Sequence, residues 1–450
     1  MIAYRPHNVL STLRLLIMSV ITSVMIMPSI VFATPTHALD FTFYQNKNTG
    51  SGPTLLVIGG IQGDEPGGFN AASILATKYR FSRGNVWVVP NLNFPSILKR
   101  SRGVHGDMNR KFSQLNSNDP EFDTVSKIKN IILQDEVDVV LNLHDGSGFY
   151  SPTYRDKLHN PKRWGQSIII DQEKISHPRF ANLADIAGHI IASTNNVIKN
   201  TRHRYHLKNT DTAKGDKEME KTLTYFAIRH GKPAFGLEVS KEFGTVMRSY
   251  YHLLVMEKFM DHMGIEYQRN FPLSYQGVKW ALYDNLQIAL FENKVLLDVA
   301  NARDRLRYVP LKKNTPLQVS VSNPLIAVLK NKHDFSVRYG NRSITSISPQ
   351  FFEYDDSLKK ITLLVDGEER TQKLGDVVHV REKFLVRPIA NYRVNVIGYT
   401  RKGLKNESGQ VVRRRNIISR YSIDNAARMF RVEFYQGKRY CGMILVNYKK

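Results

Sequence analysis

The feature of this sequence that most constrains its fold is an alternation of short apolar runs with helical patterns between Phe41 and Ile265. The runs are rich in Val, Ile and Leu, and the segments between them repeat apolar residues at helical spacing. Strands are predicted at Thr54–Ile58, Val86–Val89, Val137–Leu143, Ser167–Ile170 and Ala234–Val239, and helices at Gly67–Tyr79, Glu121–Leu133, Phe180–Lys199, Lys217–Arg229 and Thr245–Met263. This alternation favours an α/β domain with a largely parallel sheet.

After Glu266 the helical pattern fades, and short strands separated by turn signals take its place. The 185 residues from Glu266 to Lys450 suit two small β-domains better than one. We therefore expect domains over 39–265, 266–348 and 349–450, with the last division near Ser348-Pro349. Strands are predicted at Val278–Tyr283, Gln287–Phe291, Lys294–Val299, Leu317–Val321, Leu325–Lys330, Lys360–Val365, Val377–Val380, Lys383–Val386, Tyr392–Tyr399, Arg431–Tyr435 and Cys441–Val446, with hairpin turns at Asp366-Gly367 and Gln436-Gly437.

The N-terminus has the order of a secretory signal peptide. Arg5 and Arg14 precede the apolar run Leu15–Met27, and small residues that include Ala33 and Ala38 follow it. This order predicts a signal peptide over residues 1–38, cleaved after Ala33 or Ala38. A retained N-terminal anchor is the alternative, although the run is short for a transmembrane helix. We expect an exported protein because of this order, and no other segment of the sequence is apolar over a sufficient length to span a bilayer.

The chain is strongly basic, with 64 Lys and Arg against 40 Asp and Glu and a formal charge of +24. The basic residues are spread along the chain without the aromatic motif of an RNA-binding domain, so the charge does not indicate nucleic acid. An exported protein meets anionic polymers of the envelope instead, and a generally basic, solvated surface is the simplest interpretation. The single cysteine, Cys441, excludes an intrachain disulfide, and we expect it to be a buried thiol on a strand.

Four polar residues stand at the carboxyl ends of predicted strands. Gln62 and Glu65 follow the first strand in GGIQGDEPGG, His144 follows VDVVLNL, and Glu238 lies in AFGLEVS. Side chains at the carboxyl ends of an α/β sheet converge on one site, so we expect these four to meet. Each also has a structural explanation when taken singly: a first-turn glutamate, a hydrogen-bonded strand-end histidine, and an ion pair between Glu238 and Lys241.

Taken together, the motifs resemble the zinc carboxypeptidase (funnelin) family. The resemblance covers Phe41 to Ile265 and rests on GGIQGDEP, on HGDMNRKF at His105–Phe112, on LNLHDG at Leu141–Gly146 and on FGLEVS at Phe235–Ser240. Related deacylases of the aspartoacylase type share GG-x-x-GDEP and DMNR. The resemblance implies a carboxypeptidase-like mixed sheet flanked by helices, which the two small all-β domains would follow.

The family pattern assigns a role to each of the four strand-end residues. It implies one zinc ion per chain, held by Glu65, His144 and Gln62, with Gln62 in the position of the family's first histidine. Glu238 matches the catalytic general base. A glutamine amide is a neutral and weaker donor than imidazole. Because the other residues of the pattern are all present, we interpret Gln62 as a weak third ligand and not as the sign of a metal-free site.

Further residues of the pattern would contact substrate. Asn109 and Arg110 match the pair that holds a substrate carboxylate. Arg102 is the expected arginine for the scissile carbonyl and the oxyanion, with Arg100 as the alternative because the spacing to Asn109 is shorter than in digestive carboxypeptidases. Tyr225 would cover the substrate or, equally well, pack in the core.

Within the family, the glutamine and the β-domains resemble the peptidoglycan DL-carboxypeptidases that determine cell shape in helical Gram-negative bacteria. This implies a periplasmic enzyme that trims tripeptide stems of the wall to dipeptides by releasing meso-diaminopimelate. The β-domains would position it on the wall or on envelope proteins, and a purely structural role is equally compatible. An aspartoacylase-like deacylase and a catalytically inactive wall-binding scaffold are the alternatives.

Overall fold

The structure is a computed structural model that describes residues 34–35, 39–46 and 52–448. Almost all of the expected signal peptide, including both expected cleavage sites, lies outside the described residues. Within the described part of the chain, no helix combines the length and apolar character needed to cross a membrane.

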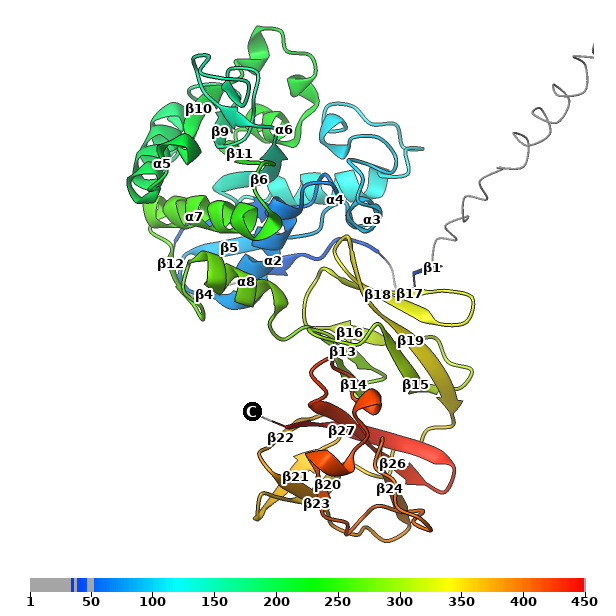
Figure 1. The fold of residues 1–450 in the computed structure, drawn as a ribbon. Coiled ribbons are helices and arrows are strands. Elements are labelled where there is room, and N and C mark those ends of the chain that lie inside the picture. The colour runs from blue at the N-terminus through cyan, green and yellow to red at the C-terminus, as the bar shows by residue number, and fades with distance from the viewer. Residues whose placement is uncertain (1–33, 36–38, 47–51, 449–450) are drawn as a thin grey trace, which may run out of the picture. The chain divides into compact units, whose positions relative to one another are not determined.

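The N-terminal part of the described chain is built on a seven-stranded mixed sheet (Figure 1). Its central strands run parallel, and β9 and β2 are antiparallel to their neighbours β11 and β5. The strands follow the order β10 (His206–Asn209), β9 (Ser167–Ile170), β11 (Ala234–Ser240), β6 (Val139–Gly146), β3 (Thr54–Ile58), β5 (Asn85–Val89) and β2 (Tyr44–Gln45). Every residue of β3 and β6 is buried, which explains the apolar character of β3 and of the first half of β6.

Helices flank this sheet, as the sequence predicts (Figure 1). Helices α2, α5, α7 and α8 pack together as one group. Helices α4 and α6 contact each other in a second group, where Nζ of Lys129 lies 4.9 Å from the centre of the Phe226 ring. The helices are α2 (Pro66–Lys78), α3 (Phe94–Lys99), α4 (Phe122–Ile132), α5 (Leu183–Val197), α6 (Leu223–Arg229), α7 (Thr245–Met263) and α8 (Tyr275–Tyr283). The 3-10 helices are η1 (Met108–Arg110), η2 (Thr201–His203), η3 (Thr212–Lys214), η4 (Met219–Lys221), η5 (Arg414–Asn416) and η6 (Ser419–Tyr421). Two short strand pairs, β4 (Tyr79–Arg83) with β12 (Glu266–Arg269) and β7 (Phe149–Tyr150) with β8 (His159–Asn160), complete this part.

The strand predicted at Val278–Tyr283 is wrong, because these residues belong to helix α8. The Ser274 side chain accepts a hydrogen bond from the Gly277 N–H and caps the helix. Val278, Ala281 and Leu282 are buried at helical spacing on one face. Packing of that face against α7 decides the conformation of a short apolar run that also suits a strand.

Among the described residues after α8, β-sheets dominate, as expected, and the only helical elements are the short 3-10 helices η5 and η6. One group consists of a five-stranded sheet, β1 (Thr34–Pro35), β17 (Ile326–Lys330), β18 (Phe335–Tyr339), β19 (Arg342–Phe352) and β15 (Arg305–Lys312), and a three-stranded sheet, β14 (Val295–Asp298), β13 (Gln287–Leu290) and β16 (Val319–Val321). The second group has two four-stranded sheets, β21 (Glu368–Lys373), β20 (Lys360–Val365), β23 (Lys383–Val386) and β25 (Val412–Arg413), and β22 (Val377–Val380), β27 (Arg439–Tyr448), β26 (Met429–Gln436) and β24 (Tyr392–Val396). These last two sheets share a separate apolar core.

Three details of the β-region bear on the sequence predictions. The turn at Asp366-Gly367 is confirmed, with φ values of +54° and +99° that glycine-containing hairpins favour. Cys441 is a buried free thiol on β27, also as predicted. The division predicted near Ser348-Pro349 falls inside the continuous strand β19, and the limits 266–348 and 349–450 stay predictions.

Candidate active site

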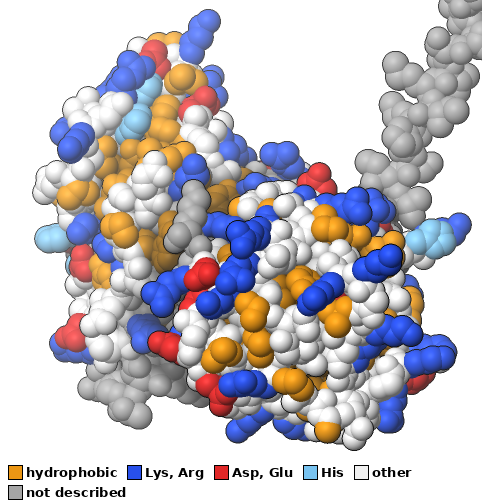
Figure 2. Space-filling view, turned by 60° about the horizontal axis from the view of Figure 1, so that its bottom comes forward, with side chains coloured by type: hydrophobic (Ala, Val, Ile, Leu, Met, Phe, Trp, Pro, Cys, Tyr) orange, Lys and Arg blue, Asp and Glu red, His pale blue; other side chains and the backbone are white. Residues whose placement is uncertain are grey.

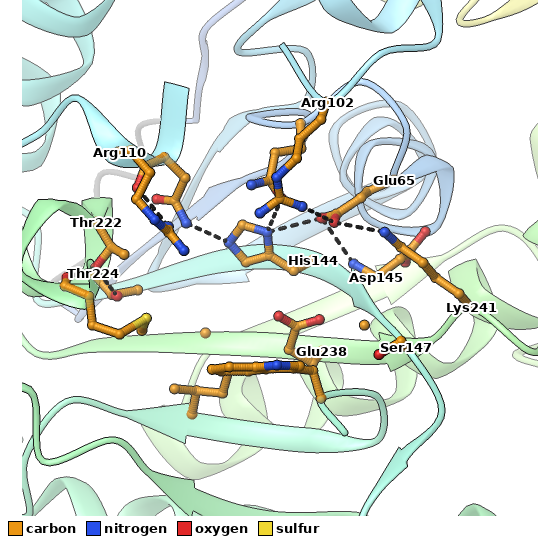
Figure 3. Close-up of a pocket in the computed structure, with 17 residues that line it drawn as sticks. Glu65, Arg102, Arg110, His144, Asp145, Ser147, Thr222, Thr224, Glu238 and Lys241 are labelled. Carbon is orange, nitrogen blue, oxygen red and sulfur yellow. Dashed lines mark hydrogen bonds and ion pairs between the residues drawn. The ribbon is translucent and has the colours of Figure 1, made fainter. Parts of the chain in front are cut away.

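The register of the sheet brings His144 and Glu238 side by side. Parallel strands β6 and β11 pair His144 with Glu238, and β3 lies on the other side of β6. The loop after β3 carries Gln62 and Glu65 to the same edge. All four line one cavity of about 290 Å³, and Figure 3 shows Glu65, His144 and Glu238 around its centre. The convergence expected at the carboxyl ends of the strands is therefore present.

Glu65 is not explained by a role at the end of a helix. It stands at the N-cap of α2 but makes no capping hydrogen bond with its side chain. Its Oε2 lies 3.0 Å from Nδ1 of His144, and its Oε1 lies 3.2 Å from Nζ of Lys241 and 3.6 Å from Nη1 of Arg102. A nearly buried carboxylate that three other groups orient in this way has the character of a ligand.

The Gln62 amide is oriented by Asp107. Its Nε2 donates to Asp107 Oδ1 at 2.8 Å, and its Oε1 lies 3.2 Å from Nδ1 of His144. An amide nitrogen donates to a carboxylate and the amide oxygen cannot, so this hydrogen bond defines which end of the amide faces His144. The glutamine therefore presents an oxygen donor to the position where Glu65 Oε2 and His144 Nδ1 also meet.

The donor set fits a zinc ion. One imidazole nitrogen, one carboxylate oxygen and one amide oxygen converge, and the separations of 3.0 and 3.2 Å agree with the roughly 3.3 Å between ligands of a tetrahedral site with bonds of about 2.0–2.1 Å. A nearby carboxylate atom, Oε2 of Glu238, is buried and has no hydrogen-bond partner among the described residues. Catalytic zinc sites use three protein ligands and leave one position open.

Replacing Gln62 by histidine is expected to increase zinc affinity by ten-fold or more, about 1.4 kcal/mol, because imidazole is the stronger donor. The measurement is competition with a zinc chelator, with Gln62→Ala as the control that should bind more weakly than the natural protein. Equal zinc retention by all three proteins would remove Gln62 from the ligand set. Activity need not rise with affinity.

The environment of Glu238 suits a general base. Burial raises the pKa of the Glu238 carboxyl above its usual value. His144 lowers this pKa, and the negative charge of Glu65 raises it. Space for the carboxylate depends on a glycine of the LNLHDG motif, because a Cβ at Gly146 would lie 2.6 Å from Glu238 Oε2. The carboxylate points into the cavity below His144 (Figure 3). The raised pKa of Glu238 and the orientation of its carboxylate into the cavity both favour proton transfer near neutral pH.

Three expected substrate residues line the rim of the same cavity. Arg102 donates from Nε to Asp107 Oδ2 at 2.9 Å, which holds its guanidinium beside Glu65. Asn109 accepts the Leu223 N–H at Oδ1 and turns its Nδ2 toward Nε2 of His144, 3.5 Å away. Arg110 is half-buried and lies 3.4 Å from Glu218 through its Nε. Figure 3 shows Arg102 and Arg110 on the same side of His144, and Asn109 lines the same cavity.

The two remaining expected residues do not line this cavity. Arg100 is exposed at the C-terminal end of α3, where it adopts a left-handed conformation. Tyr225 is buried on α6. Of the two candidates for the oxyanion arginine, the geometry therefore favours Arg102.

The sequence did not reveal several residues that the fold brings to the site. Lys241 contacts Glu65, not Glu238 as one structural explanation required. Trp164, Thr222 and Thr224 line the cavity from segments with no recognisable motif. Thr222 lies inside the helix predicted at Lys217–Arg229, whereas in the structure α6 begins only at Leu223 and the Thr222 hydroxyl caps it by accepting the Tyr225 N–H.

Asp145, beside His144, holds three elements together. Its carboxylate is buried and accepts hydrogen bonds from the Gly67 N–H at the start of α2 and from Arg248 Nη1 of α7, each at 2.8 Å. His252 Nε2 lies 3.2 Å away. Burial raises the pKa of Asp145, but His252, Arg248 and the Gly67 N–H lower it more, so that the carboxylate is ionised over the ordinary pH range.

Replacing Asp145 by asparagine is expected to destabilise the protein by about 3–5 kcal/mol, because the Arg248 charge would lose its buried partner. The readout is the midpoint of thermal unfolding. Glu266→Gln removes an exposed carboxylate whose distance to Arg83 is 3.7 Å, so it serves as the matched control and should cost less than about 1 kcal/mol. Equal midpoints for the two variants would contradict the structural role of Asp145.

The fold and the donor set define this protein as a metallo-carboxypeptidase. Residues 17–283 match the catalytic domain described as a carboxypeptidase controlling helical cell shape, and residues 354–449 match the C-terminal domain of metallo-carboxypeptidases. The chain belongs to this family of cell-shape carboxypeptidases.

The chain is also similar to solved structures and, over a shorter stretch, to a curated relative of different activity. Cell shape determinant protein Csd4 from Helicobacter pylori is 38% identical, with a TM-score of 0.81 over 91% of this chain and 100% of that chain. Its mDAP-bound form, described as a D,L-carboxypeptidase, gives the same identity and TM-score over 90% and 100% of the two chains. An N-alpha-acetyl-L-2,4-diaminobutyric acid deacetylase from Halomonas elongata is 35% identical over 105 residues, 22% of this chain and 30% of the length of that relative.

Proposed function

We propose that the protein is a periplasmic, zinc-dependent DL-carboxypeptidase that trims peptidoglycan tripeptide stems to dipeptides. It releases the terminal meso-diaminopimelate and thereby affects cell shape. The observation that carries the proposal is the position of Glu238. Its Oε2 is buried, has no hydrogen-bond partner within residues 34–35, 39–46 and 52–448, and lies in one cavity with Gln62, Glu65 and His144. Similarity to Csd4, which has been solved with tripeptide, with product and with mDAP, supports the substrate class.

In this proposal Gln62, Glu65 and His144 hold the zinc ion. When bound there, zinc acts as a Lewis acid and lowers the pKa of water. Glu238 accepts a proton from the attacking water and passes it to the leaving amine, a transfer that its raised pKa favours. Arg102, held by Asp107 at the rim of the cavity, faces the developing oxyanion and stabilises its charge.

Asn109 and Arg110 bind the carboxylate of the terminal residue. A guanidinium binds a carboxylate through two parallel hydrogen bonds, which fixes the chain end relative to Glu238. The Glu218 carboxylate at 3.4 Å from Arg110 is mostly exposed and can yield to a substrate carboxylate. This requirement for a free chain end is what makes the enzyme a carboxypeptidase. Tyr225 is buried outside the lining of the cavity, and we assign it to core packing.

The test is incubation of the zinc-loaded protein with purified tripeptide muropeptide and, separately, with N-acyl amino acids. We expect dipeptide and free meso-diaminopimelate from the first and at least a hundred-fold slower turnover of the second. The reverse preference would establish the deacylase alternative, which the similarity to the Halomonas deacetylase raises. A third outcome would indicate an inactive scaffold. In that case the protein purified without chelators contains no zinc, and it turns over neither substrate after zinc is added.

The proposal also includes the domain limits and the setting of the enzyme. We assign residues 39–265 to the catalytic domain and residues 266–348 and 349–450 to the two β-domains. Export by the N-terminal segment places the enzyme beside its polymeric substrate in the periplasm. The β-domains then hold it on the wall or on envelope proteins.

A further inference from the structure

A second cavity, of about 920 Å³, lies among strands β15, β19, β24 and β26, and it shares no lining residue with the active site. Basic side chains outnumber acidic ones in its lining. They are five arginines, Arg305, Arg307, Arg393, Arg420 and Arg431, against a single carboxylate, Glu433. The cavity is therefore a concentration of positive charge within the β-region.

Several of these arginines are free to bind an anion. Arg307, Arg393 and Arg420 form no ion pair with a carboxylate of the described residues. Arg393 lies over the Tyr435 ring at 4.6 Å, and Arg420 over the Tyr421 ring at 5.1 Å. Stacking on a ring leaves the edge of the guanidinium, which carries its N–H donors, open to a ligand.

The negative charge of Glu433 is already used within the protein. Its Oε1 lies 3.4 Å from Nη1 of Arg431, and its Oε2 accepts a hydrogen bond from the Tyr435 hydroxyl at 2.6 Å. Both Arg431 and Glu433 are buried. The Nε of Arg431 is buried without a partner among the described residues. Arg305 is paired with Asp334 at 3.7 Å. Burial raises the pKa of Glu407 and Glu433, and the nearby charge of Arg393 lowers it. The excess positive charge that an anionic ligand would meet therefore comes chiefly from Arg307 and Arg420.

A strained bulge turns Arg307 and Tyr308 toward solvent at this cavity. The register of β15 shifts between Leu306 and Val309, and Tyr308 has a φ of +54°, which is unusual for a bulky residue. Arg431 donates to the carbonyl oxygens of Arg307 and Tyr308, at 3.0 and 3.1 Å, and holds the bulge in place. Tyr308 is 62% exposed as a result. Bulges that re-aim side chains recur beside functional sites.

We propose that this arginine cavity binds the carboxylates of peptidoglycan stem peptides, as a second, non-catalytic site for the polymer that the enzyme cuts. The inference rests on the proposed function, because that function supplies a polymer with many carboxylate-bearing peptides. Arginine binds carboxylates bidentately, and the neighbouring tyrosine rings offer faces for the rest of the ligand. Occupation of two sites on one polymer raises the local concentration of substrate at the active site.

The control must separate the cavity from the basic surface as a whole. Lys and Arg side chains are spread over the face shown in Figure 2, where Asp and Glu are fewer. Arg381 and Arg415 are exposed arginines that do not line the cavity. The variant Arg381→Gln/Arg415→Gln therefore removes as much charge as Arg307→Gln/Arg393→Gln without changing the cavity.

The experiment measures sedimentation of both double variants with purified sacculi at physiological salt, in a Glu238→Gln background that prevents digestion. We expect at least ten-fold weaker binding for Arg307→Gln/Arg393→Gln and less than two-fold for the control pair. Equal binding by the two variants would overturn the proposal. It would do so even if the cavity turned out to bind an acidic protein instead. If the double variant unfolds at a lower temperature, Arg307→Gln alone, at an exposed position, gives the same test.

Two further readouts define the ligand. Sacculi stripped of their stem peptides by an amidase should bind both variants equally weakly, and binding there that still depends on the cavity arginines would overturn the stem-peptide assignment. With Glu238 restored, the ratio of turnover on intact sacculi to turnover on soluble tripeptide should fall about ten-fold for the cavity variant only. An absence of turnover by every protein would contradict the proposed function, whereas the sedimentation result would still decide the cavity.

Discussion

Replacing Glu238 by glutamine is expected to remove nearly all turnover of tripeptide while the metal stays bound. Glutamine has almost the same shape but cannot accept the proton of the attacking water. Loss of a general base costs about 10²–10⁴-fold in rate. A role apart from metal binding is supported by the Glu238 Oε2, which has no hydrogen-bond partner in the described part of the chain, whereas Glu65 Oε2 lies 3.0 Å from His144 Nδ1. The measurements are steady-state turnover and zinc content on the same preparation.

His144→Ala is the matched control for this prediction. It should lose both metal and activity, whereas Glu238→Gln should lose activity alone. If Glu238→Gln also lost its zinc, Glu238 would belong to the ligand set and the general base would have to be sought elsewhere. Full activity of Glu238→Gln would exclude the proposed mechanism.

Amidation of the terminal carboxylate of the tripeptide is expected to slow the natural enzyme by roughly thirty-fold or more. Arg110 is half-buried at the rim of the cavity. A guanidinium that loses its carboxylate partner in such a site costs about 2–5 kcal/mol, which corresponds to that factor. In Arg110→Ala the free-acid tripeptide should already be a poor substrate, so amidation should matter far less there.

The non-additivity of these two changes identifies Arg110 and the carboxylate as a pair. Turnover of free and amidated tripeptide is measured for the natural protein, for Arg110→Ala and for Arg229→Ala. Arg229 is exposed at the end of α6 and does not line the cavity, so its variant should respond to amidation as the natural protein does. Equal cleavage of both substrates by the natural enzyme would replace the carboxypeptidase assignment with an endopeptidase or a deacylase.

Much of the fold could be predicted because local signals and tertiary packing agree. The helix predicted at Thr245–Met263 has those limits in the structure, since Gly264 terminates it with a φ of +71°. Strand β3 also has its predicted limits. The prediction missed β15, β18 and β19. Strand β15 pairs in parallel with β19 through a bulge, and no local pattern marks such a pair. Strands β18 and β19 form a hairpin whose Gly340-Asn341 turn was a local signal that the prediction overlooked. Helix α8 was mistaken for a strand because its packing against α7 decides its conformation.

The candidate site was predictable where a motif marked it and not where the tertiary structure alone assembled it. Gln62, Glu65, His144 and Glu238 could be named because each stands at the carboxyl end of a recognisable strand, and the structure places them in one cavity. The contacts that orient them could not be predicted. Asp107 positions the Gln62 amide across 45 residues of sequence, and such a hydrogen bond leaves no trace in periodicity or composition.

The central claim, that this site hydrolyses the bond before the terminal residue of the tripeptide, is tested most directly by mass spectrometry of a digest in ¹⁸O-water. The zinc-loaded natural protein is incubated with tripeptide muropeptide. We predict unlabelled meso-diaminopimelate and a dipeptide with one ¹⁸O atom in its new carboxylate, because water supplies that oxygen and the released amine receives only a proton. Unchanged tripeptide, or label in a product of cleavage at another bond, would contradict the account.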